Sequence, residues 1–277
     1  MTTNAQKTLV ALAVVAMGGT FGAGIGAAAA ATTVIYQDNF TGSSNTPLNG
    51  AKPTVDHGPS STWTASSAWA DSGHTKSSGN ARQNAYLTFA PTPGHVYTLT
   101  VGLDVTGTGF PNTPPSSDSG YWAALGFITA PATTGGWDGS GAGPWVLSGY
   151  KAANDLVATG PGLAGSQAFA PGITSGINTY SIVLNTGSPA YSYQVFLTNS
   201  AVTNELVGSG TFSTNPAITA VGLENGVGIA QVTNFSLTSA PVPEPATTVI
   251  YQDNFTGSGA TPLNGARPTV DHGPSST

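Results

Sequence analysis

Residues 31–42 read ATTVIYQDNFTG, and the same twelve residues return at 246–257. In the first copy, apolar and polar residues alternate, which is typical of a strand with one face in a core. Val34, Tyr36 and Phe40 are expected on one face, with Asp38 interrupting them; Ile35, Gln37 and Asn39 are expected on the other face. This stretch therefore predicts a β-strand at the start of the mature chain.

The repeat extends well beyond this strand, because residues 246–277 match residues 31–62 at a constant offset of 215. Three positions differ between the copies: Ser44 becomes Gly259, Asn45 becomes Ala260 and Lys52 becomes Arg267. Scattered substitutions in an otherwise identical segment indicate a duplication that has since drifted.

Short alternating runs bounded by Gly, Pro, Asn and Ser recur along the rest of the chain, and no helical period occurs after the first thirty residues. The predicted strands after the first are residues 85–90, 95–105, 120–129, 143–150, 177–185, 190–199, 206–213, 217–225 and 230–239. This number and spacing predict an all-β protein, a two-sheet antiparallel sandwich. We expect residues 181–197 to form a hairpin, and the first strand to pair with the last.

Composition excludes some classes of function. Charged residues make up 6 % of the chain, and the net charge is −6. The six Lys and Arg residues are not clustered, so they cannot neutralise a phosphate backbone, and no nucleic-acid partner is expected. The chain contains no cysteine, so its stability must come from a packed core.

The first thirty residues have the pattern of a secretory signal peptide: Lys7, an apolar stretch, and a run of alanines at the expected cleavage site. We therefore expect a secreted, extracellular protein at the cell surface. The predicted organisation is a signal peptide at 1–30, a sandwich domain at 31–240, a Pro-rich linker at 241–245 and the partial second copy at 246–277.

The stretches YLTFAPTPGHVYTLTVGLDV, WAALGF, GAGPWVL, AVGLENG and VTNFSL, with Tyr36 before them, resemble the concanavalin A-like, LamG-type jelly-roll domains of bacterial exported proteins. This resemblance implies a jelly-roll sandwich. The tetrapeptide VPEP at 242–245 resembles the sorting tag of the PEP-CTERM system, but the repeat follows it in place of the usual apolar span and basic cluster.

The residues give no sign of an enzyme. Glycoside hydrolysis needs two carboxylates across the scissile bond, and the paired-acid strand motif of the glucanases with this resemblance is absent. The sequence has no Cys or G-x-S-x-G nucleophile. The resemblance also implies calcium, for which Asp38, Asp118 and Asp138 are candidate ligands; capping of turns by their side chains is the alternative.

Two residues are candidate glycan contacts. Trp137 lies in the Gly-rich stretch TTGGWDGSG, outside the predicted strands, and an exposed indole can stack on a sugar ring. Neighbouring Asp138 can accept a hydrogen bond from a hydroxyl. These residues predict a polysaccharide partner.

The second copy admits three interpretations: the beginning of a further domain, a donor strand that enters the first-strand position of another molecule, or a strand that displaces the first strand of its own molecule. The donor residues would be Val249, Ile250, Tyr251, Asp253 and Phe255, in place of Val34, Ile35, Tyr36, Asp38 and Phe40. The sequence thus favours a non-catalytic structural subunit of an extracellular fibre or surface array, built from copies of this chain. The alternative is a LamG-like carbohydrate-binding module that acts through loop aromatics.

Overall fold

The computed structural model describes residues 31–59, 62–73, 83–104, 123–134, 143–148, 156–159, 167–169, 174–225, 231–242, 251–252 and 270–271. Residues Ala30–Glu244 belong to one compact unit, and the two strands β15 and β16 lie outside it. Candidate residues Asp118, Asp138, Trp137, Val249, Ile250, Asp253 and Phe255 fall outside the described residues. The part of the chain that is described holds no helix long and apolar enough to cross a membrane.

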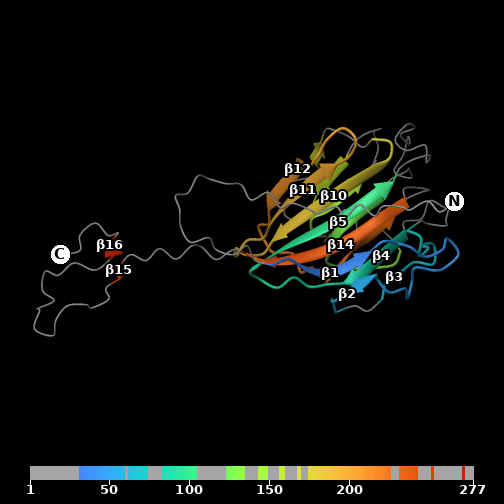
Figure 1. Cartoon of the computed structure of the whole chain (residues 1–277), viewed down its shortest axis with the longest axis horizontal. Helices are drawn as coiled ribbons and strands as arrows, with labels where there is room; N and C mark the ends of the chain where they lie inside the picture. The colour runs from blue at the N-terminus through green and yellow to red at the C-terminus, as the bar shows by residue number, and fades with distance from the viewer. Residues whose placement is uncertain are drawn as a thin grey trace, which may run out of the picture. The chain divides into compact units, whose positions relative to one another are not determined.

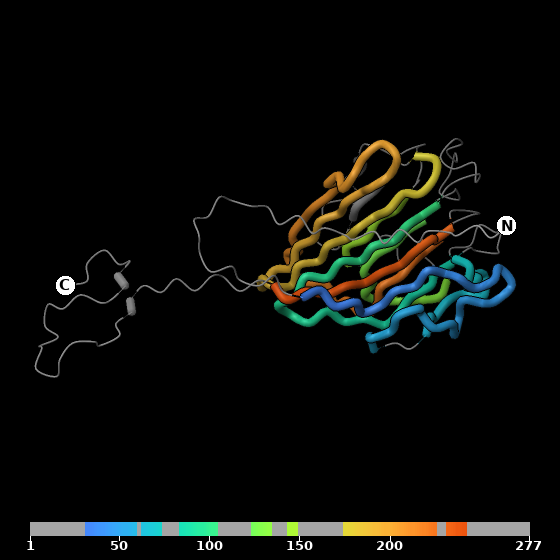
Figure 2. The backbone as a smooth tube through the Cα atoms, viewed as in Figure 1, coloured from blue at the N-terminus to red at the C-terminus, as the bar shows by residue number. Residues whose placement is uncertain are grey.

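The chain folds as a jelly-roll sandwich of two antiparallel sheets, which confirms the predicted fold class (Figures 1 and 2). The first sheet has the order β12-β11-β10-β5-β14-β1-β2, and the second has the order β3-β4-β13-β6-β7-β8-β9. Strands of the first sheet are β1 (Thr33–Asp38), β2 (Val55–Asp56), β5 (His95–Asp104), β10 (Ile177–Asn185), β11 (Ser192–Thr198), β12 (Glu205–Thr211) and β14 (Gln231–Pro241). Strands of the second sheet are β3 (Thr64–Ala65), β4 (Gln83–Thr88), β6 (Ala123–Ile128), β7 (Trp145–Ser148), β8 (Leu156–Thr159), β9 (Gln167–Phe169) and β13 (Ala220–Asn225).

The first and last strands of the sandwich pair, as the sequence predicts. In Figure 1, β1 and β14 run side by side although they are the first and last strands of the sandwich in the sequence. Thr33 lies opposite Ser239, and Asp38 lies opposite Phe235. The predicted hairpin is also confirmed, because β10 pairs with β11.

A β-bulge corrects one detail of the first strand. The register of β1 against β14 shifts between Val34 and Tyr36. An extra residue breaks the alternation of faces. Ile35 therefore packs against the core, and the expectation that Val34 shares the core face with Tyr36 and Phe40 is wrong.

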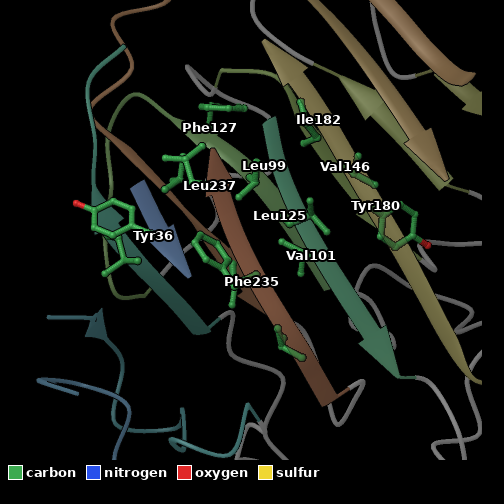
Figure 3. Close-up of a cluster of buried hydrophobic side chains, with 14 of the residues drawn as sticks. Tyr36, Leu99, Val101, Leu125, Phe127, Val146, Tyr180, Ile182, Phe235 and Leu237 are labelled. Atoms are coloured by element: carbon green, nitrogen blue, oxygen red, sulfur yellow. The ribbon is translucent and has the colours of Figure 1, made fainter. Parts of the chain in front are cut away.

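One large cluster of side chains fills the space between the sheets. Figure 3 shows Leu99 and Val101 of β5, Phe235 and Leu237 of β14, and Leu125 and Phe127 of β6 within this core. Inward-facing residues of both sheets interdigitate there, as they do in sandwiches generally.

A hydrogen bond joins the two sheets inside the core. The Tyr180 hydroxyl of β10 lies 3.1 Å from Ser148 Oγ of β7, and both side chains are fully buried. Burial raises the pKa of Tyr180, and the hydrogen bond with Ser148 offsets this rise in part. The pair is therefore neutral at physiological pH, and each hydroxyl satisfies the other.

We expect Tyr180→Phe to lower the free energy of unfolding by about 1–3 kcal/mol, because it leaves the buried Ser148 hydroxyl unsatisfied. Tyr180→Phe combined with Ser148→Ala should lose less, since no polar group then stays buried alone. Urea denaturation of the three chains measures the difference. A double variant less stable than the single one would contradict this account.

Candidate functional site

The structure buries three of the five tryptophans. Trp63, Trp69 and Trp145 are each at most 3 % exposed, whereas Trp122 and Trp137 lie outside the described residues. Trp63 packs edge-on against Phe235, with 5.0 Å between ring centroids, and in a tilted arrangement against Phe40, with 5.8 Å between centroids. These buried indoles stabilise the sandwich and are not available to a ligand.

Asp38 is a buried carboxylate that serves the fold. Its exposure is 4 %, its Oδ2 accepts a 2.7 Å hydrogen bond from Trp63 Nε1, and its Oδ1 accepts one of 2.9 Å from the Phe40 backbone N–H. Phe40 has a φ of 49°, a left-handed conformation that costs energy in a bulky residue. The bond to Asp38 holds this turn in place.

A second carboxylate, Asp71, lies close to Asp38 although the two are far apart in the sequence. Burial raises the pKa of Asp71 above its ordinary 3.8, and the charge of Asp38 raises it further. Gly42 allows this approach, because a Cβ at that position would overlap the Asp71 carboxyl group. The pair is repulsive when both groups are charged.

Of the three candidate calcium ligands, Asp38 lies among the described residues. Both oxygens of Asp38 already accept hydrogen bonds, and the described residues contain no group of three or more His, Asp or Glu that could hold a metal ion. Calcium usually takes six to eight oxygen ligands. The other two candidates, Asp118 and Asp138, lie outside the described residues.

The second sheet has a distinctive outer face, the one turned away from the first sheet. Tyr86, Gly222, Gly126 and Trp145 lie opposite one another on four adjacent strands. A Cβ at Gly126 would overlap Trp145, and a Cβ at Gly222 would lie 2.8 Å from that of Tyr86. The two glycines therefore make room for the two aromatic side chains over this face.

The neighbouring row of residues on this face contains two polar side chains. Asn84, Glu224 and Ala124 lie opposite one another on β4, β13 and β6, and the side chains of Asn84 and Glu224 are fully buried. Beside them, an apolar cluster includes Ala220, Trp145 and Leu147, with Tyr86 half-buried against it. Tyr86 is thus the aromatic member of this face that reaches solvent.

Asn84 also fastens the loop that precedes Trp137. Its Nδ2 donates to Ala132 O at 2.9 Å, and its backbone N–H donates to Thr133 O at 3.0 Å. Thr134 forms a β-bridge with Gln83. The chain leading to Trp137 is therefore held against β4, two residues from Tyr86.

Sequence reasoning missed Asp71, Asn84, Tyr86 and Glu224. The alternation in AVGLEN places Glu224 on one face with Ala220 and Gly222, but it does not tell which face points outward. Asp71 lies outside every predicted strand, so only the tertiary fold brings it to Asp38.

No family model matches the chain, and no curated protein matches it. Solved structures similar to it include the endo-1,3-β-glucanase from Streptomyces sioyaensis, with 13 % identity over 79 % of this chain and 100 % of the other at a TM-score of 0.46. The VIP36 exoplasmic/lumenal domain in its Ca²⁺/Man-bound form is similar with 13 % identity over 73 % of this chain and 90 % of the other, TM-score 0.48. Basic winged bean lectin with Tn-antigen has 9 % identity over 77 % of this chain and 100 % of the other, TM-score 0.44.

We expect Asp71→Asn to stabilise the protein slightly at neutral pH. The folded state raises the pKa of Asp71, so ionisation costs stability as the pH rises through 3.8 and then through the raised pKa. The gain from the neutral amide should be full at pH 7 and vanish below pH 3.8, where Asp71 is protonated in both states. Thermal unfolding of both chains across this pH range measures it, and a variant that is less stable at pH 7 would contradict it.

Proposed function

We propose that this protein is a non-catalytic glycan-binding module. Its contact surface is the outer face of the second sheet around Tyr86, extended by Trp137 and Asp138. The attachment of residues 132–134 to β4 carries this proposal, because Asn84 and Gln83, which hold this segment, belong to the same strand as Tyr86.

The chain between the attachment and Trp137 is short. Two residues, Gly135 and Gly136, separate Thr134 from Trp137, and the three Cα–Cα steps between them span at most about 11 Å when fully extended. This short connection supports including Trp137 in the proposed contact surface. Two aromatic side chains at one edge suit a sugar, because the apolar C–H face of a pyranose packs on aromatic rings.

Polar groups on the same edge complete the surface. Thr88 is exposed and Thr64 is half-buried, and both share the outer face with Tyr86. Hydroxyl groups of Thr and the carboxylate of Asp138 can exchange hydrogen bonds with sugar hydroxyls. Trp145 and Glu224 are covered, so they support this surface from within and do not contact the ligand.

The arrangement on the outer face favours binding over hydrolysis. A glycosidase places two carboxyl groups on either side of the scissile bond. Among the described residues of this face, Glu224 is the one acid, and it is fully buried. Asp38 and Asp71 lie elsewhere, and Asp38 is committed to Trp63.

The predicted signal peptide at residues 1–30 is consistent with a module that meets polysaccharide outside the cell. The other function expected from the sequence, a subunit of an extracellular fibre, depends on residues 246–277 and not on this face.

We expect Tyr86→Ala and Trp137→Ala each to weaken binding to a soluble polysaccharide by about 2- to 10-fold, because each removes the binding free energy of one aromatic contact. Affinity electrophoresis against β-glucan, mannan and xylan measures the retardation. Phe196→Ala is the matched control, because Phe196 is a half-buried aromatic residue of β11 in the first sheet.

A wild-type chain that none of these polysaccharides retards would overturn the proposal. So would equal retardation of wild type and both variants. If Phe196→Ala weakens binding as much as Tyr86→Ala, the effect is a loss of stability and the surface is wrongly placed.

A further inference from the structure

We propose that residues 246–277 of one molecule take the place of residues 31–62 in another, pairing with β14 of the acceptor. The partner is a second copy of this chain, and the interface is the β14 edge that β1 otherwise occupies. This interaction is independent of glycan binding, because β1, β2 and β14 belong to the first sheet.

The second copy forms the same strand pair as the first. β15 (Tyr251–Gln252) pairs with β16 (Val270–Asp271), with Tyr251 opposite Asp271 and Gln252 opposite Val270. In the sandwich, Tyr36 lies opposite Asp56, and Gln37 lies opposite Val55. The two registers are identical at the offset of 215 residues. Residues 246–277 thus repeat the β1–β2 pairing.

The substitutions between the copies avoid every buried position. Ser44, Asn45 and Lys52, the residues that differ, are all exposed in the first copy. The buried residues of the first copy are Tyr36, Asp38, Phe40, Leu48 and Pro53, and each is unchanged in the second. The second copy therefore retains every side chain needed to fill the position of the first, including Asp253 as an acceptor for Trp63.

The linker disfavours exchange within one molecule. The Val242 N–H donates to Gly94 O at 2.9 Å, so the chain continues along the β14 direction past Pro241. Pro243 and Pro245 fix their own φ angles, and Glu244, before a proline, is confined to extended conformations.

Exchange within one molecule needs a chain reversal. Thr248 is the counterpart of Thr33 and would have to lie opposite Ser239. The chain would then have to reverse its direction within residues 240–247, which contain the Pro-Glu-Pro sequence, and the fixed φ angles of proline disfavour this reversal. A second molecule imposes no such limit.

Competition sets the concentration at which exchange occurs. The two copies bury the same side chains and compete for the same position beside β14. The resident copy is favoured because it is covalently joined to Trp63, which gives it an effective concentration in the millimolar range. Exchange should therefore be rare at micromolar protein and increase with concentration. A chain that both donates and accepts forms open head-to-tail assemblies.

Disulfide trapping tests the interface in the full chain, which has no cysteine of its own. Gln37 lies opposite Ser236, so Gln252 of a donor would lie there after exchange. Facing residues of antiparallel strands are within disulfide range. Under oxidation, Ser236→Cys/Gln252→Cys should give a ladder of dimers and larger multiples that increases at least tenfold from micromolar to near-millimolar protein.

Two controls accompany this trap. Ser236→Cys/Gln37→Cys should cross-link within each chain and stay monomeric, and Ser236→Cys alone reports random collision. A Ser236→Cys/Gln252→Cys chain that cross-links only within itself, or forms no more dimer than Ser236→Cys, overturns the proposal.

A matched pair of proline variants provides a second measurement without cross-linking. Ile35→Pro/Gln37→Pro disables the resident strand, and Ile250→Pro/Gln252→Pro disables the second copy by the same change. Light scattering should find the first variant assembled at concentrations at least tenfold lower than wild type, and the second monomeric throughout. A first variant that stays a folded monomer, or a second that assembles like wild type, overturns the proposal; if the first does not fold, the disulfide ladder decides.

Discussion

The pairing of β14 along both of its edges is the constraint on which the first sheet depends. On one side β14 pairs with β5 from Gln231 to Pro241, and on the other with β1 from Thr33 to Asp38. The first and last strands of the sandwich in the sequence are thus neighbours within one sheet. In long-range pairing of this kind, the entropy of loop closure is lost before the stabilising contacts form. The segment at the β1 edge is held to β14 by contacts between opposite ends of the domain sequence, and another segment with the same side chains would fit the same edge.

Asp38 makes this edge specific. A carboxylate on the core face would be costly unless its oxygens were satisfied. The Trp63 indole and the Phe40 backbone satisfy them, and the left-handed turn at Phe40 positions its ring against Trp63. A strand with an apolar residue in place of Asp38 would leave the buried Trp63 N–H without its acceptor. The β14 edge therefore selects strands that carry Asp at this position, and in this sequence the second copy does, at Asp253.

The sequence predicts the fold well because alternation, turn residues and the Pro- and Gly-rich breaks all favour the same class. It finds the long strands, the hairpin of β10 and β11, and the pairing of β1 with β14. It misses β2, β3, β8 and β9, since a strand of two to four residues is defined by the hydrogen bonds of its neighbours and not by its own pattern. The candidate site is less predictable. Tyr86 and Asn84 are ordinary strand residues until the tertiary fold fastens residues 132–134 beside them, and Asp71 reaches Asp38 only through the loop that carries Trp69.

The two proposed interactions use different sheets, and this separation has a physical consequence. Exchange at the β14 edge replaces one strand pair of the first sheet by its copy, whereas Tyr86 and Thr88 belong to the second sheet. A head-to-tail assembly would therefore present one glycan-contact surface per molecule, joined through the short Pro-rich linker. When several weak sites are linked, each later contact becomes intramolecular, and overall avidity exceeds the affinity of one site by orders of magnitude. A single aromatic edge that binds a sugar weakly is then sufficient for firm attachment to a repeating polysaccharide.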